Sequence, residues 1–244
     1  MSRLRRMPRR RSYDQYCSAA RALDAVGDRW TLLIVRELLA GPRRYTDLHA
    51  DLPGVSTDVL ASRLKDMERD DLATRRKLPP PAAAVVYELT ERGRGLLPVL
   101  TALARWGAPA LDERRPTDAV RAHWFAVPLM PVLAACGAGA GAGAEGVVEV
   151  RLDEGVFHIR LGGGPSDPSG RSDLSRPSDP SSPSGRDEVA YGDGPADAPD
   201  ARLVLDADTC RALGAGTLTL ADGVRAGRVE VSGDSALAKA LRGA

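Results

Sequence analysis

The sequence is poor in the residues that form disulfide frameworks and metal centres. Its three cysteines, Cys17, Cys136 and Cys210, lie far apart and outside any Cys-x-x-Cys spacing, which indicates neither a disulfide pattern nor a zinc site. The three histidines also stand singly, so we expect no metal ligands among them. Isolated thiols are typical of a reducing compartment, and we therefore expect a cytoplasmic protein.

Long apolar runs and catalytic patterns are missing as well. No uncharged apolar stretch has membrane-spanning length, and the basic N-terminus is not followed by the apolar segment of a signal peptide. No Ser/His/Asp set stands in a plausible context, and the glycine-rich run 162–170 lacks the lysine and the helix of a phosphate-binding loop. We expect neither a membrane protein nor an enzyme, and no cofactor.

Charge is present but unevenly divided. Residues 1–116 hold 22 Lys and Arg against 15 Asp and Glu, whereas residues 117–244 hold 12 against 18. A basic half joined to an acidic half indicates that one part meets a polyanion. The basic half opens with six arginines in residues 1–12, which predict a disordered arm that is either a solvated tail or a DNA-touching segment.

The length predicts two domains, and the apolar pattern predicts an α+β fold that begins with helices. Apolar positions recur every three or four residues from Tyr13 to Val26, as on one face of a helix. Asp28 can then cap a second helix that is apolar almost all round and should be the central buried one. Gly41-Pro42 ends it, because glycine and then proline stop a helix.

A helix-turn-helix pattern follows. A short helix is predicted from Tyr45 to about Asp51, then a Pro53-Gly54 turn, then a longer helix that the Ser56 hydroxyl can cap. The inner face of the longer helix consists of Leu60, Leu64 and Met67. At 3.6 residues per turn the outward side chains are then Asp58, Ser62, Lys65 and Arg69. This outward face is where a major groove could be read.

Two strand-like runs, Leu72–Leu78 and Val85–Leu89, come next and predict a hairpin with a stiff, proline-rich tip. A final helix should open at Thr90. Its apolar side is wide enough to pack on more than its own domain, which favours dimerisation through it. The winged helix-turn-helix domain is therefore predicted to span residues 13–115.

The second half predicts a smaller α/β domain of sheet and helices over residues 147–244, after a connecting segment at 116–146. His123–Cys136 should be helical, with Pro128 and Pro131 breaking or kinking it, and 137–146 should be a flexible linker. Val147–Leu161 reads as a β-hairpin, and 162–187 as an unfolded insertion. The rest should form a strand at Ala201–Leu205, helices near Asp208–Leu213 and Thr219–Ala226, a strand at Val229–Val231, and a last helix from Asp234.

Basic side chains bracket the helix-turn-helix in three groups, before it, on it and along the hairpin. Phosphate neutralisation needs cations arranged in this way around a groove-sized element, although a solvated helical surface has the same composition. The predicted DNA contacts are Arg43, Arg44, Ser56, Thr57, Ser62, Arg63, Lys65, Arg69, Arg75, Arg76 and Lys77.

The order and spacing of several motifs resemble those of the HxlR-type winged helix-turn-helix regulators. They are the run from Cys17 to Leu38 with Trp30 inside it, Gly41–Leu48, Leu52–Ser56, Leu78-Pro-Pro-Pro and Val86–Gly93. The resemblance covers residues 16 to about 107. It implies a dimeric, sequence-specific DNA-binding transcription regulator, with dimer contacts from the first and last helices, base reading from the helix at Ser56, and backbone contacts from the wing.

Two further expectations come from resemblance. Members of that family often carry a cysteine in the first helix, which in some of them senses oxidants or electrophiles; Cys17 stands there, with a buried packing role as the alternative. The segments 200–206, 218–223 and 227–234 resemble the sterol-carrier-protein type fold, which implies a cavity for a small apolar effector. The long insertion and the scarcity of aromatic residues depart from that pattern, so a structural or dimer-supporting domain stays open.

The function expected is therefore a transcription regulator that binds double-stranded DNA as a homodimer and responds to a small apolar ligand. The alternative is a ligand carrier or protein-interaction protein whose helix-turn-helix does not read DNA.

Overall fold

The computed structural model describes residues 12–81, 83–111, 114–138, 145–162 and 190–243. The expected basic arm, most of the linker and nearly all of the insertion lie outside these ranges. The chain divides into two compact units, residues 1–100 and 101–244. None of the described helices is long and apolar enough to cross a membrane.

The first unit is built around one buried helix. Its helices are α1 (Ser18–Val26), α2 (Thr31–Leu39), α3 (Tyr45–Asp51), α4 (Thr57–Arg69) and α5 (Glu91–Arg94). Ile34 and Val35 of α2 are fully buried, which confirms it as the central helix. As expected, the Asp28 carboxylate caps it, since Oδ1 accepts hydrogen bonds from the N–H groups of Trp30 (2.8 Å) and Thr31 (3.0 Å).

The first helix is shorter than predicted, because α1 begins at Ser18 and not at Tyr13. The preceding segment turns back onto α1: the Asp24 carboxylate accepts from the Ser12 hydroxyl and the Tyr13 N–H, each at 3.0 Å. Asp14 accordingly adopts a left-handed φ of 52°. This local hydrogen bonding competes successfully with helix extension.

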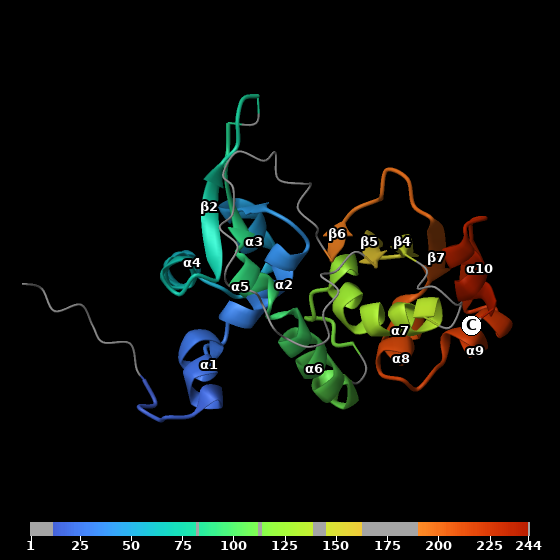
Figure 1. Cartoon of the computed structure of the whole chain (residues 1–244), viewed down its shortest axis with the longest axis horizontal. Coiled ribbons are helices and arrows are strands. Elements are labelled where there is room, and N and C mark those ends of the chain that lie inside the picture. Colours follow the sequence, from blue (N-terminus) through green and yellow to red (C-terminus); the bar gives the residue numbers. More distant parts are fainter. Residues whose placement is uncertain (1–11, 82, 112–113, 139–144, 163–189, 244) are drawn as a thin grey trace, which may run out of the picture. The chain divides into compact units, whose positions relative to one another are not determined.

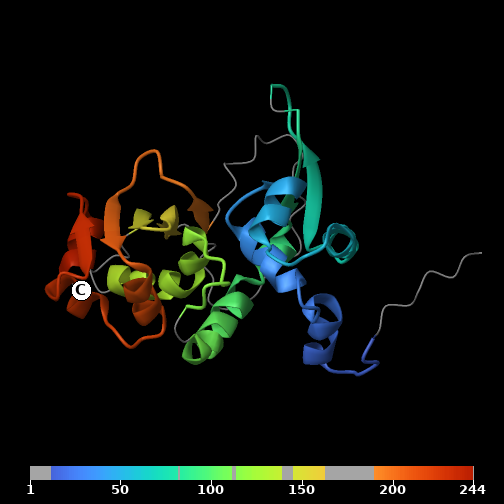
Figure 2. The same ribbon diagram turned by 180° about the vertical axis from the view of Figure 1, so that it is seen from behind.

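A small antiparallel sheet completes the unit. Its strands are β1 (Arg43–Arg44), β2 (Ala73–Lys77) and β3 (Val85–Leu89), in the order β1-β3-β2. The β2–β3 hairpin confirms the predicted wing and projects beyond the helices of its unit in both ribbon views (Figures 1 and 2). Its base is held by the buried side chains of Ala73, Val86 and Leu89.

The last helix predicted for this region is two helices, α5 and α6 (Leu97–Gly107). Thr90 caps α5 by accepting the N–H of Gly93 at 3.1 Å. Gly93 approaches the wing so closely that a Cβ there would lie 2.0 Å from the carbonyl oxygen of Leu72. Pro98 lacks an N–H and fits best in a first helical turn, and a new helix starts just before it.

The second unit is a five-stranded sheet covered by helices on one face. The strand order is β6-β5-β4-β7-β8, and the central pair β4–β7 is the parallel one. The strands are β4 (Gly146–Leu152), β5 (Gly155–Leu161), β6 (Tyr191–Asp193), β7 (Ala201–Leu205) and β8 (Val229–Ser232). The α-helices are α7 (Ala126–Ala138), α8 (Ala207–Gly214), α9 (Leu220–Arg225) and α10 (Ala236–Gly243). The 3-10 helices η1 (Ala108–Ala110) and η2 (Ala122–Phe125) precede them.

Two predictions for this unit need correction. Helix α7 is one uninterrupted helix, so the expected break at its prolines is wrong, while the expected kink stays a prediction: Pro128 lies in the first turn, and Pro131 is accommodated inside. The fully buried side chains of Leu129 and Leu133 show why, since tertiary packing of α7 against β5, α8 and α10 outweighs the lost hydrogen bond. Strand β6 was not predicted at all, because its three residues follow a polar, low-complexity run.

The face of the sheet opposite the helices is partly covered by a loop between β6 and β7, which arches over it in Figure 1. Glu149 of β4 points to this side and accepts hydrogen bonds from Arg151 (2.8 Å), Arg202 (3.3 Å) and the N–H of Ala196 in the loop (3.1 Å). Burial by itself would raise the pKa of Glu149. The hydrogen bonds and the two guanidinium charges outweigh burial and lower it.

The register of α4 can be tested with one core deletion. Leu64 is 1% exposed, so Leu64→Ala should lower the free energy of unfolding of the first unit by about 2 to 5 kcal/mol in chemical denaturation followed by circular dichroism. Val59→Ala is the matched control, since Val59 is on the same helix but 39% exposed, and its effect should stay within about 0.5 kcal/mol. Equal stability of Leu64→Ala and the unaltered chain would contradict the register.

Candidate nucleic-acid interface

The turn between α3 and α4 sets the direction of the outward helix. Leu52 and Val55 of this turn are buried, and Gly54 has a φ of +84° that a side chain would strain. The Ser56 hydroxyl accepts the N–H of Val59 at 3.3 Å and so caps α4. In addition, the Tyr45 hydroxyl at the start of α3 donates to the carbonyl of Thr57 at 2.8 Å. The first turn of α4 is therefore tied to α3.

Helix α4 presents the predicted faces. Leu60, Leu64 and Met67 are buried, and the exposed positions include Asp58, Ser62, Lys65 and Arg69. Among the described residues Lys65 has no ion-pair partner, whereas Arg69 pairs with Asp66 at 2.8 Å and with Asp70 at 3.4 Å. The unpaired polar groups in the middle of the helix are thus Ser62 and Lys65.

Arg63 occupies a different position from its neighbours. Its guanidinium lies 3.6 Å from Asp28, the residue that caps α2, and 2.7 Å from Asp66 on α4. The side chain is only 26% exposed. These contacts hold α4 against the start of α2, so Arg63 is a positioning residue in this structure.

The small sheet brings together two basic groups that are distant in the sequence. Arg43 and Arg75 both pair with Tyr87 of β3, and Arg44 and Arg76 both pair with Val86. In an antiparallel sheet directly paired residues point to the same side. Arg43 and Arg75 therefore lie on one side of the sheet, on either side of Tyr87. Arg44 and Arg76 lie on the other side, next to Val86. The sequence predicted β3 as a strand with alternating sides. It did not predict that β1 pairs with β3, which is what brings Arg43 and Arg44 next to the wing.

The wing arginines are held by specific neighbours. The Arg76 guanidinium makes two hydrogen bonds to the Glu88 carboxylate, at 2.9 and 3.0 Å. Arg75 lies over the Tyr87 ring, 5.9 Å from its centroid, and 3.9 Å from Glu68 of α4. Burial raises the pKa of Tyr87, although the nearby Arg75 charge opposes the rise, so its hydroxyl stays protonated near neutral pH.

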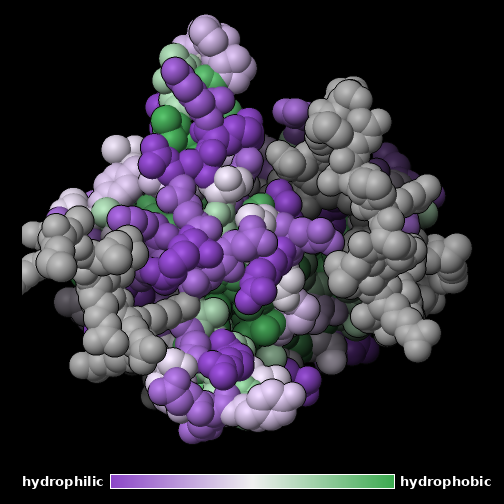
Figure 3. Space-filling view, turned by 60° about the vertical axis from the view of Figure 1, so that its left-hand side comes forward, coloured by the Kyte–Doolittle hydropathy of each residue, from purple (hydrophilic) through white to green (hydrophobic). Residues whose placement is uncertain are grey.

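Lys77 is exposed beyond these pairs, toward the tip of the hairpin. Figure 3 shows the projecting hairpin as mainly hydrophilic on the side seen. Across this unit, exposed hydrogen-bonding and basic side chains lie on α4, at the start of α3 and along the wing. This arrangement can contact a polyanion at several points along one face of the unit.

The comparisons with known proteins agree with this geometry. The family model described as HxlR-like helix-turn-helix matches residues 25–115. The HTH-type transcriptional regulator YvaP of Bacillus subtilis is 35% identical over 92 residues, which cover 38% of this chain and 85% of that protein. The chain belongs to the HxlR-like helix-turn-helix family.

Other relatives match the same part of this HxlR-like chain. The regulator YodB of Bacillus subtilis is 35% identical over 85 residues, covering 35% of this chain and 76% of YodB. The solved structure of reduced YodB has 30% identity and a TM-score of 0.36, and the match covers 41% of this chain and all of that one. Residues 116–244 lie outside the family match.

Cys17 of this HxlR-like protein lies at the N-cap of α1, directly before its first residue, and is exposed. The buried packing role considered for it is therefore not observed within the single chain. By contrast, Cys210 of α8 is buried, and burial raises its pKa to about 12. Among the described residues no group of three or more Cys, His, Asp or Glu is placed to hold a metal ion.

The positioning role of Arg63 predicts a loss of stability. Arg63→Ala should lower the free energy of unfolding by about 0.5 to 1 kcal/mol, the scale of a partly exposed ion pair, because Asp28 and Asp66 both lose its charge. Lys65→Ala, two residues further along α4, should leave stability unchanged in the same denaturation experiment. If Arg63→Ala instead leaves stability unchanged and weakens DNA binding as Lys65→Ala does, Arg63 contacts DNA.

Proposed function

We propose that this protein is a sequence-specific, DNA-binding transcription regulator. The observation that carries the proposal is the outward face of α4, where Ser62 and Lys65 are exposed and can read base edges, in the same unit as the cationic side chains of the wing and of β1. Membership of the HxlR-like family and relatives named as HTH-type transcriptional regulators support it.

The contacts divide into two kinds. Ser62 and Lys65, with Asp58 beside them, face a major groove and hydrogen-bond to base edges there. Arginine and lysine side chains around the helix, together with the exposed polar groups at its N-terminus, bind phosphates and set its register on the duplex. The phosphate-binding set is Arg43, Arg44, Ser56, Thr57, Arg69, Arg75, Arg76 and Lys77. Arg63 acts through α4 and holds it in place.

The protein binds DNA as a homodimer in this proposal. Leu103 and Trp106 of α6 lie on one face of the helix and are 46% and 81% exposed. Tyr16 and Leu23 at α1 are exposed large side chains as well. Burying this apolar surface against a second copy would stabilise the pair. A two-fold dimer calls for a pseudo-palindromic operator with half-sites about 34 Å apart, or a multiple of it.

The second unit is proposed to modulate DNA binding in response to a small ligand. A sheet with helices on one face is compatible with the sterol-carrier-like architecture suggested by the sequence. The alternative function is a ligand carrier or interaction protein whose helix-turn-helix does not bind DNA. Salt-dependent DNA binding discriminates between the two functions, because only groove binding releases counterions in proportion to phosphate contacts.

The test is a mobility shift with the intergenic DNA upstream of the gene, at several salt concentrations and with unrelated competitor. Lys77→Ala should weaken binding to all sequences and lower the slope of log affinity against log salt by about 0.9. Ser62→Ala should weaken operator binding selectively, with the slope unchanged. If unrelated competitor DNA removes all binding and the protein shows no preference for the operator, the alternative function is favoured.

The dimer prediction is tested by mass in solution. Leu103→Asp should shift sedimentation equilibrium from dimer to monomer at micromolar concentrations, because a carboxylate cannot be buried unpaired in an apolar interface. Val59→Asp is the matched control, since Val59 is similarly exposed but lies on α4. A monomeric unaltered chain, or a dimer that survives Leu103→Asp, contradicts the proposed interface.

A further inference from the structure

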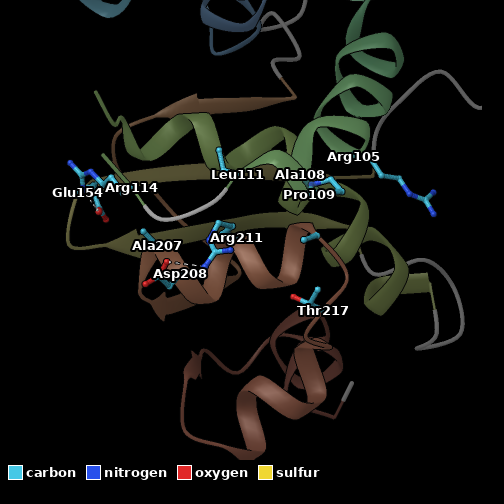
Figure 4. A pocket seen from close by; sticks show the side chains of 11 residues that line it. Arg105, Ala108, Pro109, Leu111, Arg114, Glu154, Ala207, Asp208, Arg211 and Thr217 are labelled. Carbon is cyan, nitrogen blue, oxygen red and sulfur yellow. Dashed lines mark hydrogen bonds and ion pairs between the residues drawn. The ribbon is translucent and has the colours of Figure 1, made fainter. Parts of the chain in front are cut away.

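An open groove in the second unit lies between α8 and the segment that follows α6. Its volume is about 820 Å³, which is the size of small-molecule sites. One wall consists of residues at the end of α6 and just after it, including Arg105, Pro109 and Leu111, and the other wall carries Arg211 of α8. In Figure 4 Arg211 rises from α8 toward the segment of Leu111.

The groove combines positive charge with apolar surface. Its described lining holds three guanidinium groups, those of Arg105, Arg114 and Arg211, against the carboxylates of Glu154 and Asp208. The lining therefore carries one more cationic side chain than anionic side chains. The remaining lining side chains are mostly apolar, and Leu111 is 56% exposed beside the groove. A ligand with a negative group and an apolar body satisfies both features.

Arg211 is the side chain placed to receive the negative group. Its contact with Asp208, at 3.3 Å, is an ion pair within one helix, and the Asp208 side chain is 83% exposed. Such exposed pairs contribute little, and a guanidinium has five N–H donors. A ligand carboxylate can therefore bind Arg211 in a bidentate manner without breaking a strong interaction.

The end of the groove at Glu154 offers no uncompensated positive charge to a ligand. Glu154 lies there, 3.3 Å from Arg114 through Oε1. Its Oε2 is buried and has no hydrogen-bond partner among the described residues. The Arg114 charge is thus compensated by Glu154, and a ligand carboxylate is attracted more strongly at Arg211 than at this end.

The groove is formed by the end of the helix that carries the proposed dimer face. Arg105 is about 200° around α6 from Leu103 at 100° per residue, so the groove and the apolar face use opposite sides of the helix. A ligand that bridges α8 and the segment after α6 would hold the end of α6 near α8. Ligand binding would then affect the proposed dimer face through the rigid helix α6.

We propose that this groove is the effector site of the regulator, and that it binds a small organic monocarboxylate with an apolar body, its carboxylate on Arg211. This inference rests on the proposed function for its regulatory meaning. Binding to the groove is a separate property, which can be measured without DNA.

Titration calorimetry on the full chain tests the site with octanoate as the probe, and with acetate and octan-1-ol as partial ligands. Octanoate should bind at least tenfold more tightly than either, since acetate lacks the apolar body and octan-1-ol lacks the charge. Arg211→Ala should weaken octanoate binding on the order of tenfold or more. Arg225→Ala is the matched control: Arg225 pairs with Asp222 three residues before it, as Arg211 does with Asp208, but lies outside the groove lining.

The melting temperature of Arg211→Ala is measured first, to show that it folds. Unchanged octanoate binding by a folded Arg211→Ala, equal binding of octan-1-ol, or no octanoate binding at millimolar concentration would overturn the site.

Mobility shifts with and without octanoate then test the effector role: DNA affinity should change in the unaltered chain and in Arg225→Ala, but not in Arg211→Ala. Octanoate binding without any change in DNA affinity overturns that role. Failure to bind DNA even without octanoate contradicts the proposed function and leaves the calorimetric result standing.

Discussion

The first unit depends on the burial of α2. Its apolar side chains leave water almost completely, and α3, α5 and the wing strand β3 all pack on it. Removal of this much apolar surface from water is the dominant stabilising term in a unit of this size. The same packing determines which side of each surrounding element faces outward. Ser62 and Lys65 of α4 face outward because Leu60, Leu64 and Met67 occupy the inner positions.

Charge pairs fix the positions of side chains on this scaffold but contribute little to its stability. Asp28 caps α2 and also contacts Arg63 of α4, so one carboxylate links the start of the central helix to the outward helix. Arg76 and Glu88 have a similar role within the wing. Each such pair contributes little stability where it is partly exposed. Its effect is geometric, because it gives the arginine side chain a fixed direction.

Helix α6 is the element that both units share, since its first residues belong to the first unit and its later residues to the second. A helix transmits a displacement along its length because its hydrogen bonds make it rigid. One side of its C-terminal half carries Leu103 and Trp106, and the other reaches the groove through Arg105. The proposed ligand groove and the proposed dimer face are therefore joined by one helix.

Local sequence signals determined most of the elements of this protein and the family to which it belongs. Caps such as Asp28 and Ser56, glycine and proline stops and apolar periodicity predicted α2, α3, α4, the wing and the β4–β5 hairpin, because they act through the nearest few residues. Only tertiary structure decided which cations are available. Arg63 turns inward to Asp28, and Arg43 joins Arg75 across β3, through contacts between residues far apart in the sequence. For the same reason α7 continues past Pro131: the packing of a buried helix outweighs the local preference of one residue.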